Sequence, residues 1–312
     1  MPSDSSNAAP AHISAQTTLI PAVNAWKVYL ADQGRSPHTI KAFASDVLLL
    51  AAHLPPDRNL ASITTLDLNH FIRWLQTGRG VPCSPKSLAR RITSVKAFFR
   101  WLRTGGVISI DPAEKVLQQS VVSPLPEVLT FEEIKAVLAA AKKYQHSKKP
   151  DIRPYTLLLL LLSTGIKKGE CLALSPNHLD LDNPNGPYLF VRYGSMRNRY
   201  KERKIDLPPE WVEVYREYAA QYPQGDRVFD WSPRRLEYLL EDISKEAGLS
   251  KHLSFDMCRW TCALNDYLSG LEPEKIRQKL GISKIQWREI HLKLRNLAEK
   301  ESPAQKPATQ PV

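Results

Sequence analysis

The chain has 312 residues and is 43% hydrophobic, so it is too long for one average domain and fits two domains with cores of their own. This composition excludes a collagen-like repeat and a chain that is disordered throughout. Lysine and arginine number 43 against 32 aspartate and glutamate, which gives a formal net charge of +11 at pH 7. Such an excess favours a polyanionic partner, nucleic acid first and a membrane surface second.

The cysteines and the apolar runs narrow the class of protein further. The four cysteines are scattered and form no CxxC pair and no zinc-ligand spacing with the histidines. The longest apolar run, around Leu157–Leu162, is shorter than the roughly 20 residues that span a bilayer. The N-terminus lacks the charged and apolar pattern of a signal peptide. We therefore expect a cytoplasmic protein with free thiols, no metal or cofactor, no membrane partner and no small-molecule substrate.

The first half of the chain predicts a leader and a small all-helical domain. Residues 1–16 are rich in Ser, Ala, Pro and Asn and predict a disordered leader. Apolar residues at helical spacing then predict four helices between residues 17 and 116. Ser36 and Ser84, each followed by proline, have the pattern of N-caps for the second and fourth of these helices.

A linker and a second domain are predicted after this. Residues 117–128 contain two prolines and no helical face, which is typical of a linker. Thr130 and Glu133 have the spacing of a capping box and predict the first helix of a domain that covers residues 129–300. Residues 301–312 predict a loose tail.

The second domain is predicted to combine helices with a small hairpin sheet. Its strand-like stretches are Tyr188–Val191 and the segment from Arg203 to Leu207. The predicted fold class is therefore mainly α with a small β sheet, in which an all-helical domain precedes an α+β domain.

Basic residues gather in two stretches of the sequence. Six basic residues and no acidic one lie between Ser84 and Arg103, and a second basic run from Arg192 to Lys204 contains one acid, Glu202. A helix with unopposed positive charge can lie in a major groove and contact phosphates, whereas an ordinary solvated face mixes both signs. The predicted DNA-contacting residues are Lys86, Arg90, Arg91, Lys96 and Arg100 in the first stretch, and Arg197, Arg199 and Lys201 in the second.

Several segments resemble the tyrosine recombinases, or phage integrase family, in their order along the chain. RSPHTIKAFASDV and SPKSLARRITSVKAFFRWL are similar to two helices of that family's core-binding domain. LLLLSTGIKKGECLALSPNHLDL, KERKIDLP and RWTCALNDYLSGLEPEKIRQKLGIS are similar to successive blocks of its catalytic domain. The resemblance implies an N-terminal core-binding, SAM-like domain, a C-terminal catalytic-type domain, double-stranded DNA as partner, and assembly on DNA with recombinase subunits of the same or another kind.

The resemblance also implies a chemistry, whose residues are mostly replaced here. The family cleaves DNA by attack of a tyrosine on a phosphate. Two arginines, a histidine and a second histidine or tryptophan hold this phosphate, and a hairpin lysine protonates the leaving oxygen. Arg259 is retained at its matching position. The replaced positions are Lys167 for an arginine, Asp256 for a histidine, Ile282 for a histidine or tryptophan, and His291 for the tyrosine. The hairpin lysine stays open between Lys201, Arg197 and Arg199.

We therefore expect a DNA-binding member of this family that is inactive in strand cleavage and that marks a site or regulates a mobile element. Two alternatives remain open. One is an active recombinase in which His291 attacks the phosphate, since histidine can form phosphoramidates. The other is a protein-interaction scaffold that has lost most DNA function. A covalent adduct with DNA distinguishes the first alternative, and a weak salt dependence of DNA binding distinguishes the second.

Overall fold

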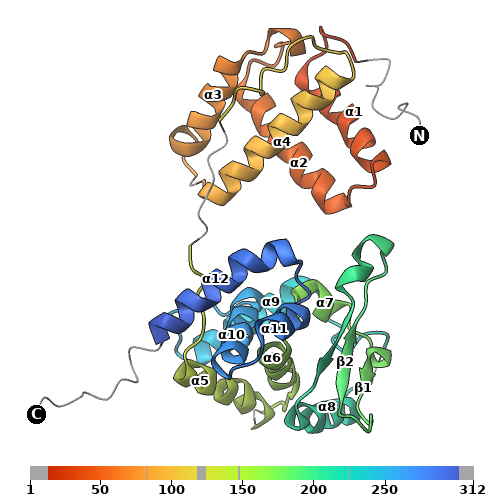
Figure 1. Cartoon of the computed structure of the whole chain (residues 1–312), viewed down its shortest axis with the longest axis vertical. Helices are drawn as coiled ribbons and strands as arrows, with labels where there is room; N and C mark the ends of the chain where they lie inside the picture. Colours follow the sequence, from red (N-terminus) through yellow and green to blue (C-terminus); the bar gives the residue numbers. More distant parts are fainter. Residues whose placement is uncertain (1–12, 82, 118–123, 147, 224, 302–312) are drawn as a thin grey trace, which may run out of the picture. The chain divides into compact units, whose positions relative to one another are not determined.

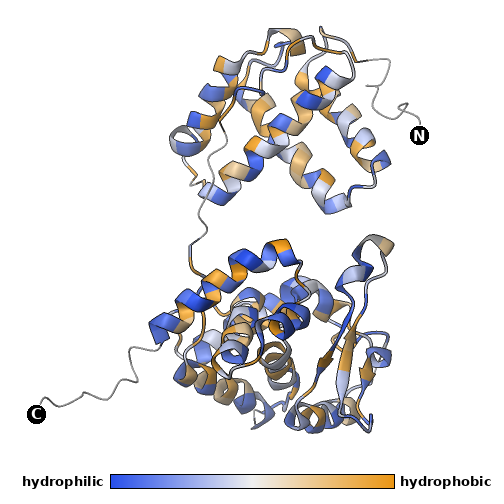
Figure 2. Ribbon diagram, in the orientation of Figure 1, coloured by the Kyte–Doolittle hydropathy of each residue, from blue (hydrophilic) through white to orange (hydrophobic). Residues whose placement is uncertain are grey.

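A computed structural model describes most of the chain and divides it into two compact units (Figure 1). The units are residues 1–124 and 125–312, and each buries a hydrophobic core of its own. In both, the helices carry hydrophobic and hydrophilic residues on different faces (Figure 2). The described residues are 13–81, 83–117, 124–146, 148–223 and 225–301.

The first unit is all-helical, as predicted. Its core contains the fully buried side chains of Trp26, Phe71, Phe98 and Phe99. Its α-helices are α1 (Leu19–Asp32), α2 (Pro37–His53), α3 (Thr65–Arg73) and α4 (Pro85–Thr104), and its short helices are η1 (Leu60–Ser62) and η2 (Trp74–Gly78).

Both serine N-caps predicted for this unit are confirmed. Ser36 Oγ accepts a hydrogen bond from the Thr39 N–H at 3.2 Å, and Ser84 Oγ accepts one from the Ser87 N–H at 3.2 Å. The packed chain begins earlier than residue 17, because Ile13 is buried in the core of this unit. The rest of the predicted leader, residues 1–12, lies outside the described residues.

The second unit combines helices with a small sheet, which confirms the predicted fold class. Its helices surround α6, whose residues Leu157–Leu161 are all buried and which lies against α5, α8, α9 and α10. The α-helices are α5 (Phe131–Lys143), α6 (Arg153–Thr164), α7 (Lys168–Leu172), α8 (Pro209–Gln221), α9 (Pro233–Glu246), α10 (Phe255–Leu268), α11 (Pro273–Leu280) and α12 (Lys284–Glu301). Its short helices are η3 (Tyr144–His146), η4 (Pro176–His178) and η5 (Met196–Lys201).

The sheet is antiparallel, with the strand order β1-β2-β3. The strands β2 (Tyr188–Val191) and β3 (Arg203–Asp206) form the predicted hairpin, in which Tyr188 is opposite Asp206 and Val191 is opposite Arg203. A two-residue strand that was not predicted, β1 (Leu179–Asp180), pairs with β2. The helical turn η5 lies between β2 and β3 and places the basic run of the hairpin at its tip (Figure 1).

The end of the predicted linker is packed against the second unit. Leu125 and Val128 contact the hydrophobic cluster formed by α10, α11 and α12, and the Leu129 N–H donates a hydrogen bond to Thr261 Oγ1 at 3.0 Å. Lys251 Nζ donates to the Val128 carbonyl at 3.0 Å. Residues 118–123 of the predicted linker lie outside the described residues. Within the described part of the chain, no helix is long and apolar enough to cross a membrane.

The predicted capping box at the start of α5 is confirmed and allows a direct test. Thr130 Oγ1 accepts from the Glu133 N–H at 3.3 Å, and Glu133 Oε2 accepts from the Thr130 N–H at 2.8 Å. Thr130→Ala removes one bond and is expected to lower the free energy of unfolding by about 1 kcal/mol. Thr130→Ser keeps the hydroxyl and should stay close to wild type in denaturant unfolding. An equal loss in both variants would contradict this role of the hydroxyl.

Candidate functional site

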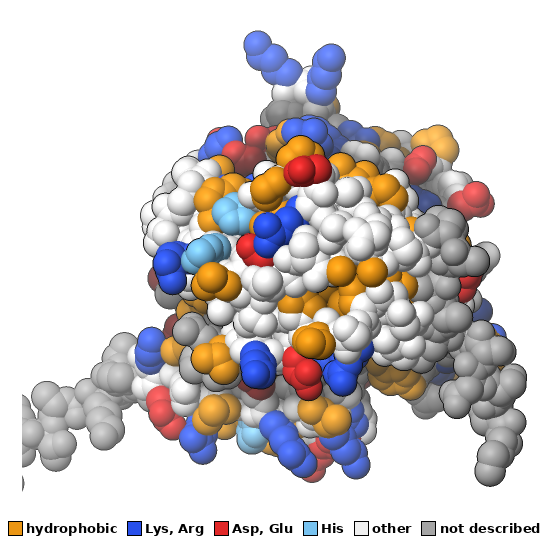
Figure 3. All heavy atoms as spheres, turned by 90° about the horizontal axis from the view of Figure 1, so that it is seen from above, with side chains coloured by type: hydrophobic (Ala, Val, Ile, Leu, Met, Phe, Trp, Pro, Cys, Tyr) orange, Lys and Arg blue, Asp and Glu red, His pale blue; other side chains and the backbone are white. Residues whose placement is uncertain are grey.

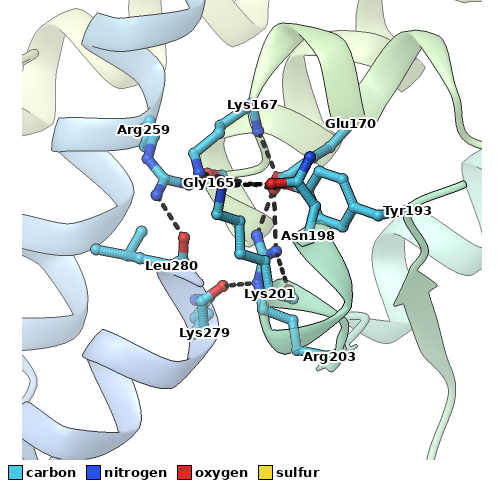
Figure 4. A network of polar contacts seen from close by, with 10 residues as sticks. All are labelled: Gly165, Lys167, Glu170, Tyr193, Asn198, Lys201, Arg203, Arg259, Lys279 and Leu280. Carbon is cyan, nitrogen blue, oxygen red and sulfur yellow. Dashed lines mark hydrogen bonds and ion pairs between the residues drawn. The ribbon is translucent and has the colours of Figure 1, made fainter. Parts of the chain in front are cut away.

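Basic side chains from four parts of the second unit gather around one carboxylate (Figure 4). The carboxylate belongs to Glu170 on α7. The residues Lys167, Lys201, Arg203 and Arg259 come from the start of α7, from η5, from β3 and from α10. The end of α11 closes the cluster on another side, through the carbonyls of Lys279 and Leu280 (Figure 4).

The centre of the cluster is a buried ion pair between Glu170 and Arg203. Arg203 Nη1 donates to Glu170 Oε1 at 3.0 Å and Nη2 donates to Oε2 at 2.9 Å. The two side chains are only 3% and 8% exposed, for glutamate and arginine respectively. A bidentate pair of this kind fixes both distance and orientation. Arg203 therefore holds β3 against α7.

Glu170 also accepts hydrogen bonds from the Tyr193 hydroxyl and from the Lys167 N–H, the latter at 2.9 Å. Burial alone would raise the pKa of Glu170, but the hydrogen bonds and the charge of Arg203, together with the two other donors, lower it to about 2. For Tyr193, burial and the neighbouring carboxylate act in the same direction and raise its pKa to about 12. Tyr193 is thus held as a neutral donor.

Arg203 fills the space beside Gly281, which ends α11. Its Nε donates to the Lys279 carbonyl at 2.6 Å and its Nη1 donates to the Lys201 carbonyl at 3.1 Å. Gly281 has a φ of +59°, and a Cβ atom there would lie 2.6 Å from Arg203 Nη1. Glycine is therefore required at this position for two reasons, the left-handed backbone and the close guanidinium.

The amines of the two lysines have different surroundings. Lys167 Nζ lies 4.0 Å from Glu170 Oε1, and its side chain is 42% exposed. Burial lowers the pKa of Lys167, and the positive charges of Arg259, Arg203 and Lys201 lower it further, against the opposite effect of Glu170. Lys201 Nζ donates to Asn198 Oδ1 at 3.0 Å.

Arg259, in contrast, turns inward. One of its Nη atoms donates to the carbonyl of Gly165, which ends α6, and the other donates to the carbonyl of Leu280 in α11. Burial is the main cause that lowers the pKa of Arg259. The structure therefore brings together three of the predicted site residues, Lys167, Lys201 and Arg259, and adds Arg203.

The remaining predicted site residues lie elsewhere. Asp256 is exposed in the first turn of α10, and Ile282 is 7% exposed in the core between α10 and α12. The His291 ring is stacked on Trp287 at 5.3 Å between centroids and meets the edge of Tyr267 at 5.8 Å. His291 thus belongs to an aromatic cluster on α12 and the second half of α10.

Three residues of the hairpin were predicted to contact DNA, and the structure describes the side chains of two of them. Lys201 lies within the cluster, and Arg199 is exposed on η5. The side chain of Arg197 lies outside the described residues. Arg203 was not among the predicted site residues. The alternation of side chains along a strand could have identified Arg203 as an inward-facing residue, because it shares one face of β3 with the buried Ile205.

The basic stretch of α4 is opposed by an acid from another helix. Asp46 on α2, which is 2% exposed, forms an ion pair with Arg90, lies 3.8 Å from Arg91 Nε and accepts from Ser94 Oγ at 2.8 Å. The expectation that this charge is unopposed is therefore wrong for Arg90 and Arg91, because the opposing acid is distant in sequence. Arg91 is also largely buried, with a side chain that is 14% exposed.

Of the other predicted contacts on α4, two are exposed and Lys96 is half-buried. Lys86 and Arg100 are exposed, and Lys96 Nζ donates to the Glu114 carbonyl at 3.4 Å. Lys96, Arg100 and Arg103 line one cavity of about 370 Å³. On the face drawn in Figure 3, lysine and arginine side chains are scattered among acidic, hydrophobic and other ones. Among the residues that the structure describes, no three His, Cys, Asp or Glu side chains gather to hold a metal ion.

Comparisons with known proteins cover both units. The family described as "Phage integrase, N-terminal SAM-like domain" matches residues 23–106, and the "Phage integrase family" matches residues 127–293. Tyrosine recombinase XerD of Listeria innocua is 24% identical over 286 residues, which cover 87% of this chain and 93% of that protein.

Two solved structures share the fold. A lambda integrase dimer bound to a COC' core site has a TM-score of 0.69 at 16% identity. This match covers 95% of this chain and 81% of the lambda integrase chain. XerH bound to palindromic difH substrate, in a post-cleavage complex, has a TM-score of 0.69 at 18% identity. This match covers 91% of this chain and 85% of the XerH chain. These matches confirm the predicted pair of a SAM-like helical domain and a catalytic-type domain.

The Glu170–Arg203 pair predicts a stability effect with a defined pH dependence. Glu170→Gln leaves Arg203 buried without its charged partner and should lower the free energy of unfolding by about 3–5 kcal/mol at neutral pH. Because the folded pKa of about 2 lies below the ordinary 4.5, the contribution is present above pH 4.5 and is lost as the pH falls toward 2. Acid unfolding of Glu170→Gln should be flatter in this window. A variant with the wild-type acid profile would contradict the assignment.

Gly281 offers a second test, with Gly270 as its matched control. Both glycines have positive φ, +59° and +81°, but a Cβ atom at Gly270 would meet nothing within 4 Å. Replacement of either by alanine should cost about 1–2 kcal/mol of backbone strain. Gly281→Ala should cost distinctly more, because its methyl group displaces Arg203. Thermal unfolding of both variants measures the difference, and equal losses would show that the guanidinium gives way freely.

Proposed function

The chain belongs to the phage integrase family, and we propose that it binds double-stranded DNA and does not cleave it. The observation that carries the binding proposal is the cluster in which four cations, Lys167, Lys201, Arg203 and Arg259, surround one acid. A site with this excess of positive charge attracts a phosphodiester. Two further observations support the same partner. The basic side chains of Lys86 and Arg100 on α4 are exposed, and the net charge is +11.

Relatives with the same fold extend the proposal to the form of the complex. The lambda integrase structure is a dimer bound to a core site, and the XerH structure is bound to its difH substrate. We propose that this chain likewise assembles on DNA with a second recombinase subunit, as a marker of a site or a regulator of a mobile element. Its four cysteines are free thiols, which agrees with action in the cytoplasm.

Three features support the absence of cleavage. His291, at the nucleophile position, is stacked on Trp287 and beside Tyr267. Ile282 is a buried core residue without a donor. Lys167 supplies a point charge and cannot grip two phosphate oxygens as a planar arginine fork does. The covalent route and the stabilisation of the phosphorane are therefore weakened together.

Tyr193 is the tyrosine whose hydroxyl lies within the cluster, and its environment opposes a nucleophilic role. Its hydroxyl donates to Glu170, and its pKa is raised to about 12. An attacking tyrosine needs the opposite, a hydroxyl that loses its proton readily. We therefore assign Tyr193 to the support of Glu170 rather than to attack on DNA.

A suicide substrate tests the absence of cleavage. DNA-affinity selection first supplies a site that the chain binds, and a nicked version of this site is then incubated with the protein. A denaturing gel should show no covalent adduct, whereas a tyrosine recombinase on its own nicked site should form one. An adduct that His291→Ala abolishes would favour the active alternative with a histidine nucleophile. An adduct that only Tyr193→Phe abolishes would point to Tyr193.

The salt dependence of binding tests the role of α4. The double variant Lys86→Ala/Arg100→Ala should reduce the slope of log K against log salt by about 2, since each lost phosphate contact removes about 0.9. Lys135→Ala removes an exposed charge on α5 and is the matched control, with an unchanged slope. Circular dichroism confirms that the variants are folded. A shallow slope in the wild type would favour the scaffold alternative.

A further inference from the structure

A groove in the first unit lies between α3 and the first half of α4. Its volume is about 540 Å³, within the range of roughly 300–1,000 Å³ that is typical of small-molecule sites. Asn69, Ile72 and Gln76 line it from α3 and η2, at the spacing of one helix face. Leu88 and Ile92 line it from α4, also on one face. Two helices therefore present a mainly apolar channel between them.

The packing beside this groove is incomplete. A small void of about 10 Å³ shares Ile72 and Ile92 with the groove, and core side chains such as Phe71 and Leu75 also line it. The turn that carries Gln76, η2 (Trp74–Gly78), is a π-helical turn, a rare form that often occurs at functional sites. Side chains around an unfilled space lack contacts on one side, so an apolar ligand group can supply them.

The polar groups of the groove favour a ligand with a negative charge. Among the described residues that line it, Lys115 is the charged one, and its side chain is exposed. The neighbouring acid, Glu114, pairs with Arg103 instead. Asn69 and Gln76 add side-chain amides, which can donate hydrogen bonds to a carboxylate.

We propose that this groove binds a small amphipathic carboxylate, with its apolar body between α3 and α4 and its charge at Lys115. The site is separate from the cluster around Glu170 and does not rest on the proposed DNA binding. An exposed ion pair adds little affinity, so burial of the apolar body supplies most of the binding. Lys115 supplies the preference for an anion.

A cysteine in the groove makes the site observable in the intact chain. Cys83 lines the groove and is half-buried, and its sulfur accepts a hydrogen bond from Arg91 Nη1 at 2.8 Å. The other three thiols are also free but are buried, at Cys171, Cys258 and Cys262. Buried thiols react slowly, so iodoacetamide should alkylate Cys83 first. A ligand in the groove should shield it.

Octanoate and its neutral counterpart octan-1-ol test the proposal on the full chain. Calorimetry should show tighter binding of octanoate. Octanoate at about ten times its Kd should slow the alkylation of Cys83, followed by mass spectrometry, about tenfold. Lys115→Ala should weaken octanoate binding about threefold, to near that of octan-1-ol, and Lys115→Arg should keep the wild-type affinity. Lys41→Ala, which removes an exposed charge on α2, is the matched control and should leave binding unchanged.

A variant that fills the groove locates the ligand. Ala89 lines the groove from α4, so Ala89→Leu should abolish both octanoate binding and the shielding of Cys83, with the thermal midpoint as a check of folding. If Ala89→Leu does not fold, the alkylation of the wild type still decides.

Three results would overturn the proposal. They are no octanoate binding, an unchanged alkylation of Cys83 when octanoate is bound, and equal affinities of the wild type for octanoate and octan-1-ol. Shielding of Cys83 that rises with protein concentration in the absence of octanoate would show that a second copy of the chain covers the groove, and it would overturn the proposal as well.

Discussion

The second unit depends on one buried ion pair, that of Glu170 with Arg203. Three further cations lie close to this carboxylate, and their mutual repulsion in a buried setting is strong because the surrounding dielectric constant is low. Glu170 offsets that repulsion, and its two oxygens fix Arg203 by a bidentate contact. Through Arg203 the pair reaches η5 and the end of α11. An ion pair between two residues thus sets the mutual position of α7, the hairpin and α11.

The two kinds of basic residue in the cluster serve different purposes. Arg203 and Arg259 direct their forks to a carboxylate and to backbone carbonyls at helix ends, and so they hold elements together. Lys167 keeps its amine 4.0 Å from Glu170 Oε1 on a side chain that is 42% exposed, and Lys201 donates to Asn198 Oδ1. The arginines thus act through fixed planar forks, whereas the lysines supply point charges.

Local sequence patterns predicted most of the fold, because a cap or a strand depends on neighbours along the chain. Ser36, Ser84 and Thr130 cap the helices that they were expected to cap. The errors and omissions about charge and about the site involve partners that are distant in sequence. Asp46 opposes the basic stretch of α4 from another helix, and Arg203 reaches Glu170 across 33 positions. Residue spacing along the chain does not reveal such contacts. The charge balance of α4 and the role of Arg203 could therefore be determined only from the structure.

The central position of the Glu170–Arg203 pair is tested most directly by a double-mutant cycle. Glu170→Gln, Arg203→Met and the double variant are compared with the wild type in denaturant unfolding at neutral pH. If the pair organises the site, each single variant leaves an unpaired buried group, and the coupling between the two changes should reach about 2–3 kcal/mol. Losses that add to within about 0.5 kcal/mol would show that the two residues act independently and would contradict this account.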